Sequence, residues 1–295
     1  RTRALPLQPF EALEDAFASG GRARAVTQQE IFRRIKRKAA LDGAGLSAPN
    51  ADAVFITASA YEYGLYGLMP NRGMALQFYQ KCAKMGHLEC ATRVAQMSLA
   101  RALGLPPEHD VDLYFGDKTS DGQSALSAAV NETTANFEAV SGRMQELVAY
   151  GQHGSASAMS TTGGLLLEGL SASGIEIQPD EHEAANHLES AAMHGSPTAM
   201  RLLGTALLDH ELTGSSKPDG RTVANGVGML LQAGQFDVRA LLDVYRASKK
   251  MKSQQAGLAL GSSAKEASAV NALSCRVPAE ALRSALYRQG MLPSV

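Results

Sequence analysis

The stretch from His182 to His187 comes closest to a metal-binding pattern. A helical zinc-protease motif needs two histidines four residues apart, because that spacing turns both imidazoles toward one ion. Here the fourth residue after His182 is Asn186, and His187 follows one position later, rotated away from the shared face of the helix. We therefore predict a solvated helix at this place and no metal ligands.

A second chemical pattern is the pair Ser262 and Lys265, which has the Ser-x-x-Lys spacing of some acyl-transfer enzymes. The sequence lacks the Lys-Thr-Gly and Ser-Asp-Asn companions of that motif, a glycine-rich phosphate loop and a Gly-x-Ser-x-Gly nucleophile elbow. Cys275 lies close to Pro278, at an expected helix break, and we assign it a structural role. We therefore predict no catalytic residue, no cofactor, no metal and no small-molecule substrate, and expect that the chain is not an enzyme.

Five basic residues are concentrated in one short segment, together with the apolar Ile31, Phe32 and Ile35. They are Arg33, Arg34, Lys36, Arg37 and Lys38. Residues 1–38 hold 9 Lys/Arg against 4 Asp/Glu, a net charge of +5, so the remainder of this chain of net charge −1 carries −6. The segment is either a solvated helix face or a contact for an anionic partner such as RNA, anionic lipid or protein.

The elements that position these residues are indicated by a recurring phrase, in which small residues end one helix, a glycine follows, and small residues open the next helix. The phrase ends at Gly43, Gly86 and Gly195, and weaker copies end at Gly154 and Gly234. The intervals between successive glycines are 43, 68, 41 and 39 residues. Since glycine adopts the left-handed conformation at low cost, we predict that Gly43, Gly86, Gly195 and Gly234 each end the second helix of a pair.

The long interval requires an insertion, and residues 104–131 contain the turn-forming Pro106, Pro107, Gly116 and Gly122. We predict that this stretch leaves the repeat as an irregular excursion and then returns to a helix, and that it is a candidate for partner contact. Apolar spacing elsewhere is helical, and alternating strand patterns are nearly absent. Helices are predicted near 9–18, 27–42, 51–65, 73–85, 88–103, 132–150, 156–169, 181–194, 197–209, 221–233, 236–248, 254–271 and 278–289.

These phrases resemble the Sel-one-like repeat, a helix pair of the tetratricopeptide type. The residues that carry the resemblance fall in three stretches: Ala58, Tyr61, Gly64, Gly67, Ala75, Tyr79, Ala83 and Gly86; then Ala156, Ala158, Gly163, Gly169, Ala184, Ala185, Leu188, Ala191, Ala192 and Gly195; then Ala199, Leu203 and Gly204. The chain departs from the family where Phe78 and His187 replace its tryptophan and Thr57-Ala58 its Leu-Gly, so it resembles a divergent member.

The resemblance implies an all-α fold, a right-handed α/α solenoid of helix pairs. We divide the chain into a basic N-terminal arm with a short helix (1–26), the repeat solenoid (27–248, with the insertion at 104–131) and C-terminal capping helices (249–295). The family further implies a non-catalytic scaffold, adaptor or structural subunit that holds other proteins in a multi-subunit assembly.

Two alternatives to a scaffold remain open. One is an RNA-contacting subunit of an organelle ribonucleoprotein, of the mitochondrial ribosome type, that uses the basic N-terminal helix. The other is an enzyme, as proposed for some relatives, although no nucleophile–base pattern supports it. The chain begins at Arg1 without an initiator Met, and Arg1–Phe10 has two Arg and no acid. This composition favours a processed or truncated chain, with a lean to the mitochondrion.

Cys82 and Cys90 are eight residues apart, across the predicted Gly86 turn, and Ala191 and Ala199 hold the corresponding places in a later repeat. Small residues at both places predict a close approach of two helices, so we expect the two cysteines to be neighbours. They are either a reduced pair that packs like the two alanines or a structural disulfide. Some cysteine-rich members of the family are similar in bridging this pair of positions.

Overall fold

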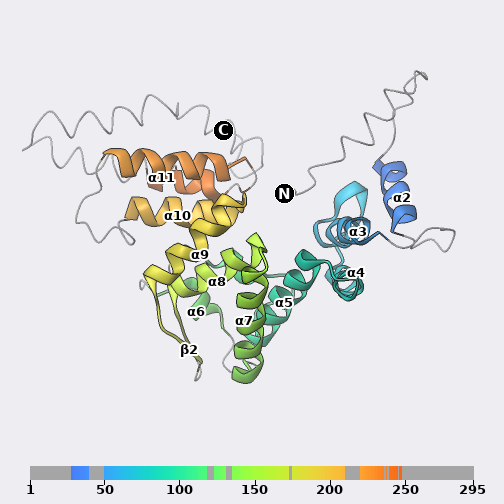
Figure 1. The fold of residues 1–295 in the computed structure, drawn as a ribbon, viewed down its shortest axis with the longest axis horizontal. Coiled ribbons are helices and arrows are strands. Elements are labelled where there is room, and N and C mark those ends of the chain that lie inside the picture. Colours follow the sequence, from blue (N-terminus) through green and yellow to red (C-terminus); the bar gives the residue numbers. More distant parts are fainter. Residues whose placement is uncertain are drawn as a thin grey trace, which may run out of the picture. The chain divides into compact units, whose positions relative to one another are not determined.

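In the computed structural model the described residues are all-α apart from one short hairpin, and their helices pack in successive pairs, which confirms the predicted fold class (Figure 1). It forms two compact units, one of Arg1–Leu113 and Ala129–Ala158 and one of Tyr114–Ala128 and Met159–Val295. The structure describes residues 28–39, 50–117, 123–130, 135–172, 175–209, 220–235, 237, 239–244 and 246–247.

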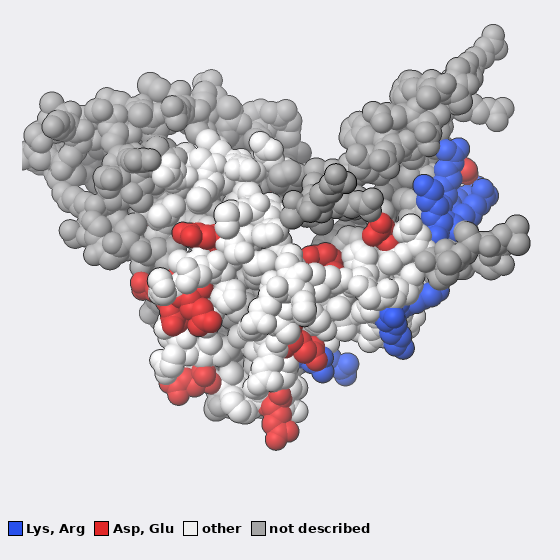
Figure 2. Space-filling view, viewed as in Figure 1, with Lys and Arg blue, Asp and Glu red and all other residues white. Residues whose placement is uncertain are grey.

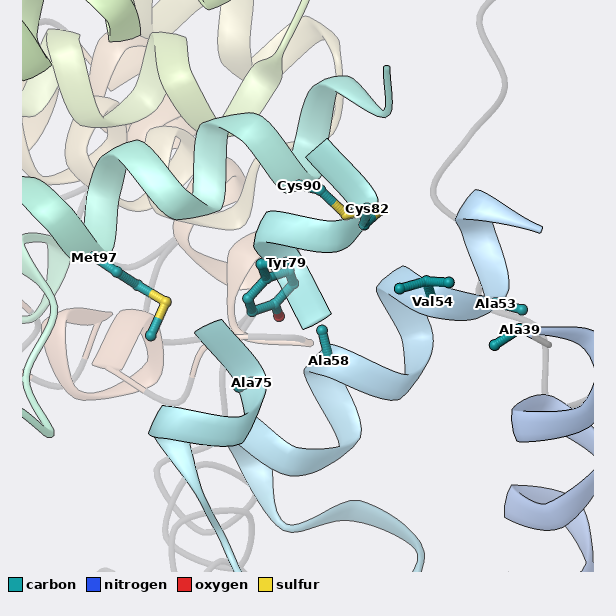
Figure 3. Packing of buried hydrophobic residues seen from close by; sticks show 9 residues of the cluster. All are labelled: Ala39, Ala53, Val54, Ala58, Ala75, Tyr79, Cys82, Cys90 and Met97. Carbon is teal, nitrogen blue, oxygen red and sulfur yellow. A yellow bond between two sulfur atoms is a disulfide. The ribbon is translucent and has the colours of Figure 1, made fainter. Parts of the chain in front are cut away.

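The first unit is a chain of packed helices. Its elements are α2 (Gln28–Lys38), α3 (Ala51–Tyr63), the 3-10 turn η1 (Leu65–Gly67), α4 (Arg72–Lys84), α5 (Leu88–Ala102), the 3-10 turn η2 (Val111–Leu113) and α7 (Phe137–Gln152). Helix α2 packs on α3, α3 on α4, α4 on α5, and α5 on α7. Each helix therefore buries one side against its neighbour, around a core of alanines, Tyr79 and the two cysteines (Figure 3).

The second unit repeats this arrangement. Its elements are most of α6 (Ala125–Ala129) and α8 (Ala156–Glu168), β1 (Leu170–Ala172), β2 (Ile175–Ile177), α9 (Glu181–Met193), α10 (Pro197–Asp209) and α11 (Gly220–Ala233). Helix α10 packs on α9 and α11. The described residues 239–244 and 246–247 are helical, as expected for 236–248.

Among the described residues, β1 and β2 form a short hairpin that connects α8 to α9. The strands pair antiparallel, with Leu170 opposite Ile177 and Ala172 opposite Ile175. Leu170 and Ile175 are each 2% exposed, so each strand of the hairpin buries one apolar side chain. Three residues a strand give too short an alternation for sequence reasoning to find.

Helix starts are fixed by side chains that accept a bond from the third residue of the helix. Asn50 accepts from Ala53 N at 3.0 Å and Asn71 from Met74 N at 2.9 Å. Asn136 and Asp180 cap α7 and α9 in the same way. Such a cap satisfies an amide that would otherwise have no partner inside the helix, which accounts for the start of α7 at residue 137 and not near 132.

The glycine prediction is confirmed at Gly86 and Gly195, with φ values of 83° and 85°, each two residues after the last residue of α4 or α9. Gly154, with φ of 95°, holds the same place after α7. Gly234 ends its helix as predicted, since it follows α11 directly, but the predicted left-handed φ is wrong there. A Cβ there would lie 2.4 Å from Leu241 Cδ2, so close packing explains this glycine. Gly43 lies outside the described residues.

Within the described part of 104–131, the regular elements are η2 and α6, and the remainder is irregular. The chain then enters α7, which completes a pair with α5. The domain boundaries drawn from sequence remain a prediction, because residues 1–26 and 249–295 lie outside the described part. The predicted helices at 9–18, 254–271 and 278–289 lie there too.

We expect Gly164→Ala to lower the free energy of unfolding by about 1–3 kcal/mol, the usual cost of overpacking a core. A Cβ on Gly164 of α8 would lie 2.5 Å from Cδ2 and Cε2 of Phe115, which is fully buried and cannot move aside freely. Urea unfolding of the two proteins measures the difference. Gly228→Ala on α11 is the control, because nothing lies within 4 Å of its added Cβ. Equal stability of Gly164→Ala and wild type would contradict the packing described.

Candidate functional site

Helix α2 presents the basic residues predicted from sequence. Arg33, Arg34, Arg37 and Lys38 are exposed, and Lys36 is half-buried with its Nζ 5.9 Å from the centre of the Phe32 ring. The one acid of the helix, Glu30, lies 3.7 Å from Arg33 Nη1 and 3.5 Å from Arg34 Nε. With five basic side chains and one acid the helix keeps a net charge of +4. Figure 2 shows the resulting gathering of Lys and Arg over α2.

The buried side of α2 is held by aromatic contacts. Phe32 meets Tyr61 of α3 edge-on and stacks on Tyr66 of η1, with ring centres 5.9 Å apart in both pairs. Tyr66 has a φ of 58°, a conformation that non-glycine residues adopt at a cost of about 1–3 kcal/mol. The stacking on Phe32 offsets part of that cost and sets α2 against η1.

The connection between α3 and α4 exposes large apolar side chains. Tyr63 is 61% exposed, Leu65 45% and Met69 85%. Since α2 packs against η1, the basic helix and this connection adjoin. We name the exposed residues of both the α2–η1 surface: Arg33, Arg34, Arg37, Lys38, Tyr63, Leu65 and Met69. Sequence reasoning missed the apolar part, although three apolar side chains around Gly64 and Gly67 were a signal.

A buried polar network lies beneath this connection. Glu62 of α3 and Asp110 before η2 both bind the guanidinium of Arg93 on α5. Arg72 of α4 binds the same Asp110, and Tyr79 OH donates to Glu62 Oε2 at 2.8 Å. Burial alone would lower the pKa of Arg93, but Tyr63, Asp110 and Glu62 hold it well above the usual range. The network thus ties the start of the excursion to three helices of its unit.

A second buried arginine anchors the excursion in the other unit. Arg201 of α10 is 2% exposed, and its Nη2 donates to the carbonyl oxygen of Phe115 at 2.7 Å. Asp243 accepts from its Nη1 at 3.3 Å, and Asp237 lies 3.5 Å from its Nε. Nearby, Glu168 accepts from Gly116 N and from Ser124 Oγ. Phe115 is therefore held by the buried Arg201, and Gly116 and Ser124 are held by the half-buried Glu168.

Burial raises the pKa of Glu168 above its ordinary value of 4.5, although bonds from Ser124 and Gly116 act in the opposite direction. A carboxyl with a raised pKa in the folded state binds its proton more tightly there than in the unfolded chain. Its contribution to stability is therefore complete below about pH 4.5 and is lost as the pH rises through the folded pKa.

We expect Glu168→Gln to remove this pH dependence, because the amide does not titrate. The free energy of unfolding of the variant, relative to wild type, should therefore increase between pH 4 and about pH 7. Urea unfolding at a series of pH values measures the difference. The part of this free-energy difference that does not change with pH measures the effect of the substitution on the hydrogen bonds from Gly116 and Ser124. A flat or falling difference would contradict the raised pKa.

The two cysteines predicted to be neighbours lie in the core of the first unit. Cys82 on α4 and Cys90 on α5 have Cα atoms 5.8 Å apart, and their sulfur atoms form a disulfide (Figure 3). Both residues are fully buried. His87 lies in the turn between them, and Cys82, His87 and Cys90 offer three donor atoms that all lie within 4.8 Å of one another. Sequence reasoning passed over His87, because it has no metal-ligand spacing to a second histidine.

The other chemical patterns of the sequence are not assembled into a site by the described residues. His187 Nε2 lies 3.7 Å from Glu183 Oε1 on α9, one turn away, and both His182 and Glu183 are exposed. Ser262, Lys265 and Cys275 lie outside the described residues. Within the part of the chain that the structure describes, no helix is both long and apolar enough to cross a bilayer.

No protein-family model and no curated protein matches this chain. Among solved structures, it is similar to a protective antigen of uropathogenic Escherichia coli that displays an SLR fold, with 17% identity and a TM-score of 0.45. The alignment covers 90% of this chain and 48% of the antigen, so this chain spans about half the length of that protein. It is also similar to a Sel1 repeat protein from Oxalobacter formigenes, with 19% identity, a TM-score of 0.40, and 77% and 76% of the two chains covered.

The chain is similar to Sel1-like repeat proteins. These solved structures carry the repeat that the sequence phrases resemble. The internal repeat is visible in the chain's own geometry, where Gly86, Gly154 and Gly195 end equivalent helices with the same left-handed conformation.

Proposed function

We propose that the protein is a non-catalytic scaffold or structural subunit that binds other proteins of an assembly through its α2–η1 surface. The observation that carries this proposal is the exposure of Tyr63, Leu65 and Met69 beside four exposed basic side chains. Apolar side chains that cluster on a surface and are rimmed by charge are typical of protein-binding sites. Packed helix pairs supply a rigid support for such a surface.

The composition of the surface favours a partner segment that is both acidic and apolar. Exposed ion pairs are each worth little, so the Arg and Lys side chains of α2 set the orientation and rate of association. Burial of Met69 and Tyr63 against a partner supplies affinity, at about 25 cal/mol per Å² of apolar surface removed from water. A purely polyanionic partner would leave these apolar side chains in water.

The experiment is cross-linking of the full chain in cell extract, followed by mass spectrometry, for three proteins. They are wild type, Met69→Asp, and the triple variant Arg33→Gln, Arg34→Gln, Arg37→Gln. The expected result is a protein partner cross-linked next to α2 through an acidic, apolar segment and lost with both variants. The control is Lys81→Gln, Lys84→Gln, Arg101→Gln, which removes three exposed positive charges from the same unit and should keep the partner.

Three outcomes contradict the proposal. If both triple variants lose the partner equally, net charge and not this surface controls binding. If nuclease treatment abolishes the capture and Met69→Asp has no effect, the surface contacts RNA, as in the ribonucleoprotein alternative. Retention of the partner by both surface variants would place the contact elsewhere on the chain.

We expect neutralisation of Arg33, Arg34 and Arg37 to leave the melting temperature within a few degrees of wild type. The three side chains are exposed, and the pairs that Arg33 and Arg34 form with Glu30 join charges in water, where such pairs contribute about 0–1 kcal/mol. Thermal unfolding followed by circular dichroism measures this. A large loss of folded protein would show that the arginine stems are packed against the unit.

A further inference from the structure

Three turns of this fold are equivalent, because each contains a left-handed glycine with the same offset from its helix. We compare the residue four before the glycine, the residue directly after it and the residue four after it. In the Gly195 turn these are Ala191, Ser196 and Ala199. The Gly154 turn has Tyr150, Ser155 and Ala158 at these places. The Gly86 turn alone has three metal-binding residue types there, and they are Cys82, His87 and Cys90.

The histidine is unexpected for its structural role. Ser155 and Ser196 start α8 and α10 by accepting from Ala158 N and Ala199 N, at 3.2 and 3.3 Å. His87 starts α5 in the same way, with Nδ1 accepting from Cys90 N at 3.2 Å. Serine is among the preferred residues at this position and histidine is not, so helix capping alone does not explain His87.

The groups around His87 orient its ring in the way that is typical of a metal-binding histidine. Since Nδ1 accepts a bond, the proton of the neutral ring is on Nε2, which lies 3.4 Å from Asp52 Oδ1. A carboxylate behind the outer nitrogen fixes the tautomer and orientation of metal-binding histidines. The ring also stacks on Phe55, with centres 5.2 Å apart, and its side chain is 18% exposed. Nδ1 is thus the unprotonated ring nitrogen, and its lone pair, which accepts from Cys90 N, is the one that a metal ion would take over.

We propose that, when the Cys82–Cys90 disulfide is reduced, the two thiolates and His87 Nδ1 bind one zinc-like ion. Cysteine sulfur and histidine nitrogen are preferred zinc donors, and they lie about 3.6–3.8 Å apart around a tetrahedral ion. The three donor atoms here lie within 4.8 Å of one another, so the site forms when the disulfide opens and Nδ1 exchanges its bond from Cys90 N for the ion. Three protein ligands leave the fourth coordination position of the ion to a water molecule, as in zinc sites that exchange this ligand.

Disulfide and metal are mutually exclusive states of this turn. A phosphine reductant takes up the oxygen of one water and becomes a phosphine oxide, while the two sulfur atoms each gain a hydrogen. The ion then displaces both thiol protons. Ala51 O lies 3.3 Å from Cys82 Sγ, so a neutral thiol can donate to this oxygen, whereas a bare thiolate would be repelled by it. The charge of the ion is therefore needed to hold Cys82 deprotonated.

The experiment uses the full chain with Cys275→Ser, so that Cys82 and Cys90 are the only cysteines. The chain is reduced with a phosphine in mild denaturant, returned to buffer, checked for two free thiols, and titrated with Co²⁺. The expected result is one ion per chain with the strong visible absorption of tetrahedral thiolate-bound Co²⁺, bleached by Zn²⁺. The oxidised chain, with no free thiol, should give no such spectrum.

Two variants make the test specific. Cys82→Ala, His87→Ser, Cys90→Ala gives the turn the residues of the Gly195 turn, so it should fold and bind no ion. His87→Ser alone keeps both thiols and restores the preferred cap, and should weaken Co²⁺ binding by more than about 10-fold, the loss typical of an outer partner. The proposal is overturned if the reduced chain gives no tetrahedral spectrum, if the triple variant binds equally well, or if His87→Ser leaves the affinity unchanged.

Discussion

Arg93→Met should lower the free energy of unfolding by about 3–5 kcal/mol, the usual effect of removing one member of a buried ion pair. The substitution keeps most of the apolar bulk of the side chain and removes only the guanidinium. Glu62, whose side chain is 5% exposed, then keeps a bond from Tyr79 but loses its counter-charge. Asp110 is left with Arg72. Urea unfolding of wild type and variant measures the loss.

The same network provides a rescue that separates charge from packing. Adding Glu62→Gln to Arg93→Met removes the uncompensated carboxylate and should recover a large part of the loss, because the two sites are directly coupled. Arg101→Met on the same helix is the matched control, since Arg101 is exposed and should change stability by less than about 0.5 kcal/mol. Equal effects at Arg93 and Arg101 would show that the network does not contribute to stability.

Features set by local backbone requirements could be predicted from the sequence. The turn glycines at Gly86 and Gly195 occur where a helix must stop and reverse, and this requirement is visible within a few residues. The close approach of Cys82 and Cys90 followed from the same register, since small residues recur at Ala191 and Ala199. The left-handed conformation predicted for Gly234 was wrong, because glycine serves both left-handed turns and close packing, and the sequence does not distinguish the two uses.

Features set by contacts between distant residues could not be predicted. Glu62 and Arg93 are 31 residues apart, and Arg201 and Phe115 are 86 apart. No periodicity connects such pairs, so a buried arginine and an exposed one look alike in the sequence. Only the basic part of the α2–η1 surface could be predicted, because charge is given by the residue type. The exposure of Met69 depends on the path of the chain and could not be predicted.

His87 lies between these two cases. Its position one residue after the turn glycine was available from the repeat, as were Ser155 and Ser196 at the same position in other copies. The informative signal was therefore the departure of one copy from its siblings in three coupled places. A search for metal-ligand spacing within a single helix could not detect it, because the three donors come from the end of α4, the turn and the start of α5.

Arg201→Met should also cost about 3–5 kcal/mol, because it leaves buried acceptors without their donor. Asp243 loses its bond from Nη1, and the carbonyl oxygen of Phe115 loses its bond from Nη2. Burial already raises the pKa of Asp243, and Arg201 is the main influence that opposes this rise. In the variant the pKa of Asp243 should therefore rise further, so that the stability loss is greater at neutral pH than near pH 4.

The loss should be accompanied by a local opening that Arg93→Met does not produce. Phe115 is fully buried against α8, and its carbonyl bond to Arg201 is one of the contacts that fix the backbone there, beside the bond from Gly116 N to Glu168. Hydrogen exchange should therefore quicken at the amides of residues 114–117 and on α10, while α3 and α4 keep wild-type rates. Arg239→Met is the control, because that arginine also pairs with Asp237 but is half-buried. If Arg239→Met destabilises as much as Arg201→Met, or residues 114–117 stay protected, Arg201 does not hold the excursion to its unit.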